Sequence, residues 1–220
     1  MSDNPVAETV RVAVMNQVPE SSAGVCAETP LAHVGLAEVA GQCSTEGGVH
    51  FRELGLRGHL TLRCNPNDPE LLQSVLRVLG MVLPLTPLSS VESNERVVRW
   101  ISPDEWLITV PNDQTFELAR RFREHVTGHY SLVNGSGGLT VFQISGDKVV
   151  DLLKKSTPID LHASVFPVGK VVSTVFAKAG AVIRRTGVNE FELVVRRSFA
   201  DYLWLWIQSA AQEFGLVVEA

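Results

Sequence analysis

The same order of secondary-structure patterns occurs twice along the 220 residues, and this repeat constrains the fold more than any other feature. Each half contains an alternating apolar strand, an amphipathic helix, short strands joined by tight turns, and a second amphipathic helix. The halves extend over about residues 50–128 and 129–220. The repeat therefore predicts an internally duplicated α+β domain of strand-helix-hairpin-helix halves over residues 48–220.

The element boundaries are predicted from apolar periodicity, Gly and Asn turns, and helix-capping residues. In the first half we expect a strand over 54–64, a helix over 68–80, a loop over 84–94, strands over 96–101 and 106–110, and a helix over 112–128. In the second half we expect a strand over 139–144, a helix from Asp147, strands over 171–176, 181–185 and 190–195, and a helix over 198–214. Three helix caps are predicted, at Asp68 before Pro69, at Asn112-Asp113 and at Ser198–Asp201.

The last predicted helix is apolar on more than one side. Leu205 lies nearly opposite the core face, and Trp204 lies at its edge. A helix with two apolar sides is normally covered on both, so we expect a partner-binding surface at Tyr202, Trp204 and Leu205. The alternative is that Trp204 and Leu205 lie beneath loops of the same chain.

The overall composition excludes several classes of protein. A net charge of −5 and a pI near 5.7 argue against a nucleic-acid-binding protein. The basic pairs are interpreted as solvated edges; they are Arg120-Arg121, Lys154-Lys155, Arg184-Arg185 and Arg196-Arg197. No apolar run is long enough to span a membrane, and the start of the chain lacks a signal-peptide pattern. Cys26, Cys43 and Cys64 are odd in number without C-x-x-C spacing, which favours a reducing compartment. We therefore expect a cytoplasmic protein.

Residues 1–47 contain short, weakly patterned apolar pieces among Ser, Gly, Glu and Ala residues. Val10–Val14 has the pattern of a short strand, but its neighbours supply little apolar surface to bury it. We interpret residues 1–47 as an N-terminal arm, either without fixed structure on its own or lying along a partner.

Two patterns resemble ligand-binding motifs without meeting their requirements. The glycine-rich run Asn134–Gly138 precedes a predicted strand, whereas a phosphate loop follows a strand and opens a helix. We interpret it as a link between the halves. His125 and His129 have metal-ligand spacing, but Gly128 lies between them and no glutamate follows His125. We predict no metal site.

Two acidic patterns resemble acid/base groups. Asp104-Glu105 follows Pro103 in a predicted turn, where Asp ordinarily bonds to the backbone. Asp160 and His162 are close in sequence, but no nucleophile with a recognisable motif lies near them. The residues themselves therefore predict no catalytic centre.

Several runs, in their order and spacing, resemble the gamma subunit of heterotetrameric sarcosine oxidase. They are Arg57–Arg63 with Asn67–Pro69, Pro103–Leu107, Leu152–Lys155 with Pro158–His162, Phe176–Gly180, and Arg196-Arg197-Ser198-Phe199-Ala200-Asp201-Tyr202-Leu203-Trp204. The last run is the most specific, and the likeness covers roughly residues 30–220.

This resemblance implies a fold related to the folate-binding domain of aminomethyltransferase, the T-protein of glycine cleavage. It implies assembly with alpha, beta and delta subunits into a flavoenzyme that demethylates sarcosine to glycine, with hydrogen peroxide and either formaldehyde or methylene-tetrahydrofolate as products. It places FAD, FMN, NAD and tetrahydrofolate on the larger partner subunits and zinc on the smallest, with no cofactor on this chain.

Two other functions remain open from the sequence. A free-standing folate-binding one-carbon enzyme of the same fold would need a carboxylate to bond a pterin, for which Asp160 and Glu192 are candidates. A scaffold for a different amine-oxidising complex is the second alternative. The K-G-C-x-x-G-Q-E run of related iron–sulfur-repair proteins is absent from the sequence.

Overall fold

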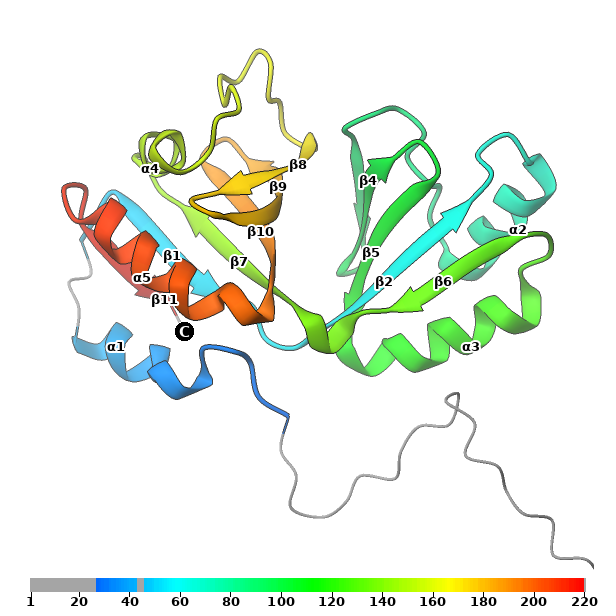
Figure 1. Ribbon diagram of the computed structural model, residues 1–220, viewed down its shortest axis with the longest axis horizontal. Coiled ribbons are helices and arrows are strands. Elements are labelled where there is room, and N and C mark those ends of the chain that lie inside the picture. The colour runs from blue at the N-terminus through cyan, green and yellow to red at the C-terminus, as the bar shows by residue number, and fades with distance from the viewer. Residues whose placement is uncertain (1–26, 43–45, 220) are drawn as a thin grey trace, which may run out of the picture.

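The computed structural model describes residues 27–42 and 46–219, which form two lobes that each contain one β-sheet (Figure 1). The elements in chain order are η1 (Ala32–Val34), α1 (Leu36–Gln42), β1 (Val49–Glu53), β2 (Arg57–Cys64), α2 (Pro69–Leu79), β3 (Ser90–Ser93), β4 (Arg96–Ser102), β5 (Glu105–Pro111), η2 (Asn112–Gln114), α3 (Thr115–His125), β6 (Tyr130–Asn134), η3 (Ser136–Gly138), β7 (Leu139–Ser145), α4 (Val149–Ser156), β8 (Val171–Phe176), β9 (Ala179–Gly187), β10 (Glu190–Arg196), η4 (Arg197–Phe199), α5 (Ala200–Ala211) and β11 (Leu216–Glu219).

Each repeat gives its first strand to the sheet of the other repeat. One sheet has the order β3-β4-β5-β2-β6 and the other the order β11-β1-β7-β10-β9-β8. β1 pairs antiparallel with β7, and β6 pairs antiparallel with β2. The chain therefore crosses between the lobes twice, over residues 54–56 and 135–138. A cut at the predicted boundary between 128 and 129 would separate paired strands.

The strand registers show that the two sheets repeat one pattern. Arg99 on β4 lies opposite Leu107 on β5, and Arg184 on β9 lies opposite Glu192 on β10. Each of these hairpins is followed by a single 3₁₀ turn and a helix, η2–α3 in one repeat and η4–α5 in the other. The predicted duplicated α+β fold is thus confirmed, and Arg99 and Arg184 occupy equivalent positions in it.

The predicted strands lie within or overlap β2, β4, β5, β7, β8, β9 and β10, but four strands were missed. The missed strands are β1, β3, β6 and β11, each only four or five residues long. β3 falls in the predicted loop over 84–94 and joins β4 through Asn94 and Glu95, whose φ angles are 49° and 61°. Without the usual glycine, this tight turn has no clear signal in the sequence.

One of the three predicted helix caps is confirmed. Asp68 accepts a hydrogen bond of 3.0 Å from Leu71 N at the start of α2, with Pro69 as the first helical residue. The predictions at Asn112-Asp113 and Ser198–Asp201 are wrong, because α3 and α5 continue directly from η2 and η4 and have no side-chain cap bond. The preceding 3₁₀ turn supplies carbonyl partners instead, as in the bond from Thr115 N to Asn112 O.

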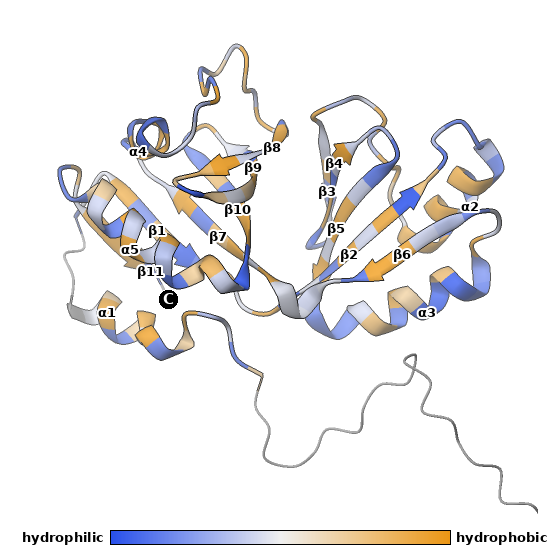
Figure 2. Ribbon diagram, viewed as in Figure 1, coloured by the Kyte–Doolittle hydropathy of each residue, from blue (hydrophilic) through white to orange (hydrophobic). Residues whose placement is uncertain are grey.

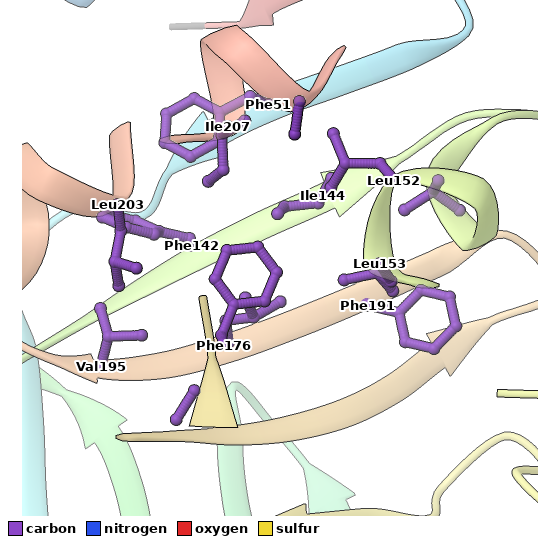
Figure 3. Packing of buried hydrophobic residues seen from close by; sticks show 14 of the residues in the cluster. Phe51, Phe142, Ile144, Leu152, Leu153, Phe176, Phe191, Val195, Leu203 and Ile207 are labelled. Carbon is purple, nitrogen blue, oxygen red and sulfur yellow. The ribbon is translucent and has the colours of Figure 1, made fainter. Parts of the chain in front are cut away.

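Apolar side chains form a core between each sheet and its helices, and a smaller contact between the sheets. Hydrophobic residues accordingly occur along the strands and helices of both lobes (Figure 2). The larger core packs α4 and α5 against one sheet through residues that include Phe51, Phe142, Leu152, Phe191 and Leu203 (Figure 3). The contact between the sheets has Leu107, Val141 and Val194 at its centre. The lobes are therefore joined by packing as well as by the two crossovers.

The described part of the N-terminal arm packs on its own chain. Leu31 is fully buried, and Val34, Leu36 and Val39 pack against the larger core. The prediction of an arm without its own structure or on a partner is therefore wrong for residues 27–42, whose spaced apolar residues complete the core. Val10–Val14 lies outside the described residues.

We predict that Gly146→Ala lowers the free energy of unfolding by about 2–4 kcal/mol. Gly146 has φ of +111°, and a Cβ atom there would lie 2.4 Å from Gly48 O. A shift of this carbonyl would weaken the hydrogen bond that it accepts from Lys148 N. Gly180→Ala is the control, since its Cβ would meet nothing within 4 Å. Equal urea-denaturation midpoints for the two variants would contradict the prediction.

Candidate functional site

The predicted partner-binding surface on α5 is only partly exposed. Leu205 is 62% exposed and Tyr202 is 36% exposed, so both are accessible on the outer side of the helix. Trp204 is 4% exposed, and its ring centroid lies 4.9 Å from that of Phe51 on β1. The side chain of Trp204 is therefore part of the chain's own core and is not a surface contact.

The reason is the strand exchange, which the periodicity of α5 does not reveal. β1 enters the sheet of the second repeat beside β7, and Phe51 packs there against both Phe142 and Trp204. This strand covers the side of α5 that carries Trp204, within the same chain. Tyr202 and Leu205, together with the 39% exposed Phe199, remain as the candidate surface.

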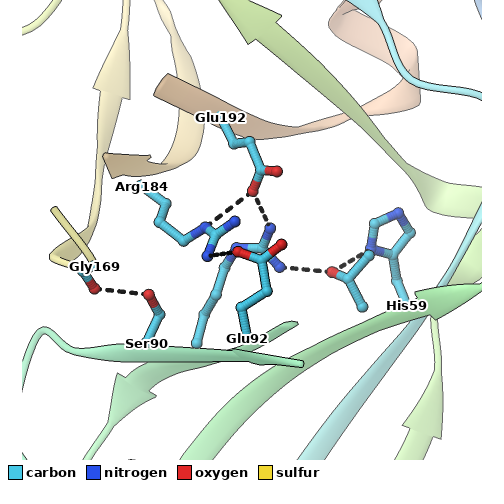
Figure 4. Close-up of polar contacts among 8 residues, drawn as sticks. His59, Ser90, Glu92, Gly169, Arg184 and Glu192 are labelled. Atoms are coloured by element: carbon cyan, nitrogen blue, oxygen red, sulfur yellow. Dashed lines mark hydrogen bonds and ion pairs between the residues drawn. The ribbon is translucent and has the colours of Figure 1, made fainter. Parts of the chain in front are cut away.

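Between the lobes lies a cluster of charged side chains, which we call the ion cluster and define as Glu92, Arg99, Arg184 and Glu192 (Figure 4). Glu192 Oε2 accepts from Arg99 Nη2 at 2.7 Å and from Arg184 Nε at 3.0 Å. Arg184 Nη1 donates to Glu92 Oε2 at 2.8 Å. Since β3 and β4 belong to one lobe and β9 and β10 to the other, the cluster joins the lobes.

Three of the four charges are removed from water. The side chains of Arg99, Arg184 and Glu192 are 1%, 4% and 12% exposed, whereas Glu92 is 53% exposed. Burial alone would raise the pKa of Glu192, but Arg99 and Arg184 outweigh it and hold this pKa below its ordinary value. Burial lowers the pKa of Arg99 to about 10, with Glu192 opposing and Arg184 adding to the shift. Arg99 and Glu192 are therefore both charged at neutral pH.

The polar contacts continue from Arg99 to a buried histidine. Arg99 Nη1 donates to Thr109 Oγ1 at 2.7 Å, and Thr109 Oγ1 lies 3.4 Å from His59 Nδ1. Burial, with added repulsion from Arg99 and Arg57, lowers the pKa of His59 from 6.5 to about 4. His59 is therefore neutral at physiological pH.

We predict that this histidine makes the chain less stable as the pH falls from 6.5 to about 4. In that range the unfolded chain takes up a proton at this position and the folded chain does not, so about 3 kcal/mol of stability is lost. Unfolding free energies measured at several pH values should show this slope in the wild type and lose it in His59→Gln. The exposed His125→Gln should retain it; equal slopes in all three proteins would contradict the prediction.

The basic pair Arg184-Arg185, expected at a solvated edge, is buried instead. Arg185 donates from Nη1 to Phe166 O at 2.9 Å and lies over the Phe191 ring at 5.3 Å. Arginine in an otherwise apolar strand, as at positions 99 and 184, was the one available signal for the ion cluster. Sequence reasoning missed it because Arg99 meets Glu192, and Arg184 meets Glu92, only through contacts between the two repeats.

The two acidic patterns considered as acid/base groups make local contacts. Asp104 accepts from Arg63 Nη2 at 2.7 Å and from Ser102 at 2.9 Å, and Arg63 chiefly lowers the pKa of Asp104. Asp160 accepts from the backbone N of His162, whose Nδ1 lies 2.7 Å from Ser164 Oγ. The Asp160 carboxylate therefore contacts the backbone of His162, and the His162 ring contacts Ser164.

The predicted link at residues 134–138 is part of the second crossover and contains η3. Ser136 Oγ accepts from His59 N at 3.0 Å, which ties this crossover to β2.

His125 is exposed at the end of α3. No group of three or more potential metal-ligating side chains gathers within residues 27–42 and 46–219. Burial raises the pKa of the Cys64 thiol to about 11.

Comparison with known proteins decides the family. Residues 63–213 match the model of the sarcosine oxidase, gamma subunit family. The chain is 30% identical over 184 residues to the sarcosine oxidase subunit gamma of Corynebacterium sp. strain P-1, covering 82% of this chain and 88% of the relative. This chain belongs to the sarcosine oxidase gamma subunit family. Another gamma subunit, from Arthrobacter sp., is 28% identical over 182 residues, covering 82% of this chain and 88% of that one.

Solved structures agree with this family in fold. A chain of the heterotetrameric sarcosine oxidase from Corynebacterium sp. U-96, solved with pyrrole 2-carboxylate, superposes with a TM-score of 0.76 at 24% identity, covering 86% of this chain and 96% of that chain. The glycine cleavage aminomethyltransferase T of Bartonella henselae gives a TM-score of 0.55 at 13% identity, covering 80% and 48%. The predicted aminomethyltransferase-like fold is confirmed.

Proposed function

We propose that this chain is a non-catalytic gamma subunit of a cytoplasmic heterotetrameric sarcosine oxidase. It would assemble with alpha, beta and delta subunits, which would hold FAD, FMN, NAD and tetrahydrofolate. The likeness to a chain of a heterotetrameric sarcosine oxidase over 96% of that chain's length supports a subunit role. In the described residues, no helix is long and apolar enough to cross a membrane.

The observation that carries the non-catalytic role is the use of Glu192. Its carboxylate was the candidate for bonding a pterin in a free-standing folate enzyme. It is instead held by two buried arginines in the ion cluster. The apolar side chains of the two sheets meet elsewhere, in the contact centred on Leu107, Val141 and Val194. A ligand that used Glu192 would have to break these contacts and leave two arginines unpaired in the interior.

The proposed contact surface consists of Tyr202, Leu205 and Phe199 on the outer side of α5 and the turn before it. Exposed aromatic and aliphatic residues of this kind contribute most when they are buried at the centre of an interface. Because Trp204 is committed to the core, it fixes the position of α5 and does not itself contact the partner.

Co-expression of a tagged chain with the three other subunits tests assembly. We expect all four to co-purify and to oxidise sarcosine with release of hydrogen peroxide. A Tyr202→Ala, Leu205→Ala variant should lose at least tenfold in affinity for the partners. Val133→Ala, at a 58% exposed apolar residue on the other lobe, is the matched control. Unchanged assembly of the double variant would exclude this surface.

A titration of the isolated chain with tetrahydrofolate separates the alternative enzyme from the subunit. Binding to the free-standing fold would change the tryptophan fluorescence with a saturable dependence on ligand concentration. We expect no saturable change. Tight binding or turnover by the chain alone would overturn the non-catalytic role.

A further inference from the structure

A pocket of about 360 Å³ lies where both crossovers pass between the lobes, and we call it the junction pocket. This volume falls within the range of small-ligand sites. Its polar lining contains Glu28, Arg57, His59, Asn112, Ser136 and Arg197. The pocket is separate from the α5 surface and from the ion cluster, and neither role described above uses it.

Arg57 at the start of β2 has hydrogen-bonding capacity that the described residues leave unused. Only 26% of its side chain is exposed, yet its one ion pair, with Glu95 Oε1, is 3.8 Å long. Glu95 is itself 71% exposed. A guanidinium carries five N–H donors in a planar arrangement that matches a carboxylate. A partly buried arginine whose only ion pair among the described residues is this long can bind a further anionic group.

His59 supplies a neutral donor on the same pocket. Thr109 Oγ1 accepts a hydrogen bond from Arg99 Nη1, so its own hydroxyl proton is available to His59 Nδ1. When this hydroxyl donates to Nδ1, the neutral imidazole carries its ring proton on Nε2. The second ring nitrogen of His59 makes none of the contacts drawn in Figure 4. A neutral N–H donor can form a hydrogen bond to an anion, and it adds no second positive charge to the interior.

The remaining lining is held in place by short, fixed elements. Asn112 is the first residue of η2, and Arg197 is the first residue of η4. Arg197 Nη1 donates to Glu28 O at 3.0 Å, which fixes the segment 27–30 at the pocket. Donors that are already oriented lose little conformational freedom when a ligand binds.

We propose that the junction pocket binds a carboxylate group, with Arg57 as the charged donor and His59 and Asn112 as neutral donors. The carboxylate belongs either to a small organic acid or to an acidic side chain of a partner protein. Both sources present the same planar, singly charged group to Arg57. The proposal stands whether or not the chain assembles as a sarcosine oxidase subunit.

Titration of the full-length chain with sodium acetate and with glycine, at constant ionic strength in chloride, tests this site. The ¹⁵N NMR signals of the His59 imidazole and the Arg57 guanidinium should shift in a saturable manner. Arg57→Met, which keeps the apolar stem, should weaken binding at least about tenfold. Arg63→Met should not, because Arg63 lies at the other end of β2 and pairs with Asp104. Glu95→Gln should leave binding equal or tighter.

Two further measurements distinguish the sources and the ligand class. If acetate binds to the assembled complex as well as to the isolated chain, the ligand is a small acid; if assembly blocks it, a partner side chain occupies the pocket. Inorganic phosphate bound as tightly as acetate would show a general anion site and overturn the assignment. The absence of a saturable shift in the isolated chain, or equal binding by Arg57→Met, would also overturn it.

Discussion

Replacing Glu192 with alanine is expected to lower the free energy of unfolding by about 3–5 kcal/mol. Glu192 Oε2 is the shared acceptor of Arg99 and Arg184, whose side chains are 1% and 4% exposed. Without this carboxylate, two like charges would face each other in the interior with only the half-exposed Glu92 nearby. The loss should appear as a lower urea midpoint in equilibrium unfolding.

The matched control is Glu92→Gln, which removes an exposed carboxylate from the same ion cluster. We expect it to change the unfolding free energy by less than about 1 kcal/mol, because solvent screens this pair. A further variant separates the cost of unpaired charges from loss of shape: Glu192→Leu with Arg99→Met and Arg184→Met should recover most of the stability. If Glu192→Ala costs no more than Glu92→Gln, the cluster does not hold the lobes together.

The acid sensitivity of the chain should have two parts that these variants separate. Glu192, with its lowered pKa, contributes stability that is present above its unfolded pKa and is lost as the pH falls through the folded value. The contribution of His59 is lost at higher pH, between 6.5 and about 4. His59→Gln should therefore leave the loss at the lowest pH intact.

Much of the fold could be predicted from the sequence because local patterns determined it. The β-branched and aromatic residues of Arg96–Ser102 and Leu139–Ser145, and the capping pattern of Asp68 and Pro69, act within a few residues of the chain. β6 and β11 gave no such signal, since their residues are largely exposed or half-buried. Their places depend on pairing with β2 and β1, which are far away in the sequence.

The candidate sites could be predicted less well, for a related reason. The periodicity of α5 identified two apolar sides, but it could not reveal which side the chain itself covers. That depended on the exchange that brings Phe51 to Trp204 across about 150 residues of sequence. Arg99 and Arg184 become neighbours only because equivalent strands of the two repeats face each other. The junction pocket likewise forms only where the two crossovers meet.

The exchange also explains why the lobes should behave as one unit. Each sheet contains a strand from the other repeat. The facing sides of the two sheets are joined by the ion cluster and by the apolar contact of Leu107, Val141 and Val194. Pulling the lobes apart would break apolar packing and buried ion pairs together, and separating the two repeats would also break strand pairing. A subunit with this construction presents α5 to a partner as a rigid surface, which reduces the entropy lost on assembly.

Trp204→Ala is the second variant with a large expected effect, because it tests whether this residue belongs to the core or to an interface. Removing a fully packed tryptophan should lower the unfolding free energy of the isolated chain by about 3–5 kcal/mol. Leu205→Ala, one residue along the same helix but 62% exposed, should change it by less than about 0.5 kcal/mol. Thermal and urea unfolding of both variants without partners provide the measurement.

Assembly should depend on these two positions in the opposite order. Trp204→Phe keeps an aromatic ring against Phe51, so a folded variant should bind the partner subunits with nearly unchanged affinity. Leu205→Ala should be as stable as the wild type and yet bind more weakly, because its side chain contributes only at the partner surface. If Trp204→Ala unfolds at the same urea concentration as Leu205→Ala, Trp204 is not part of the core, and the packing of α5 on the exchanged strand β1 is wrong.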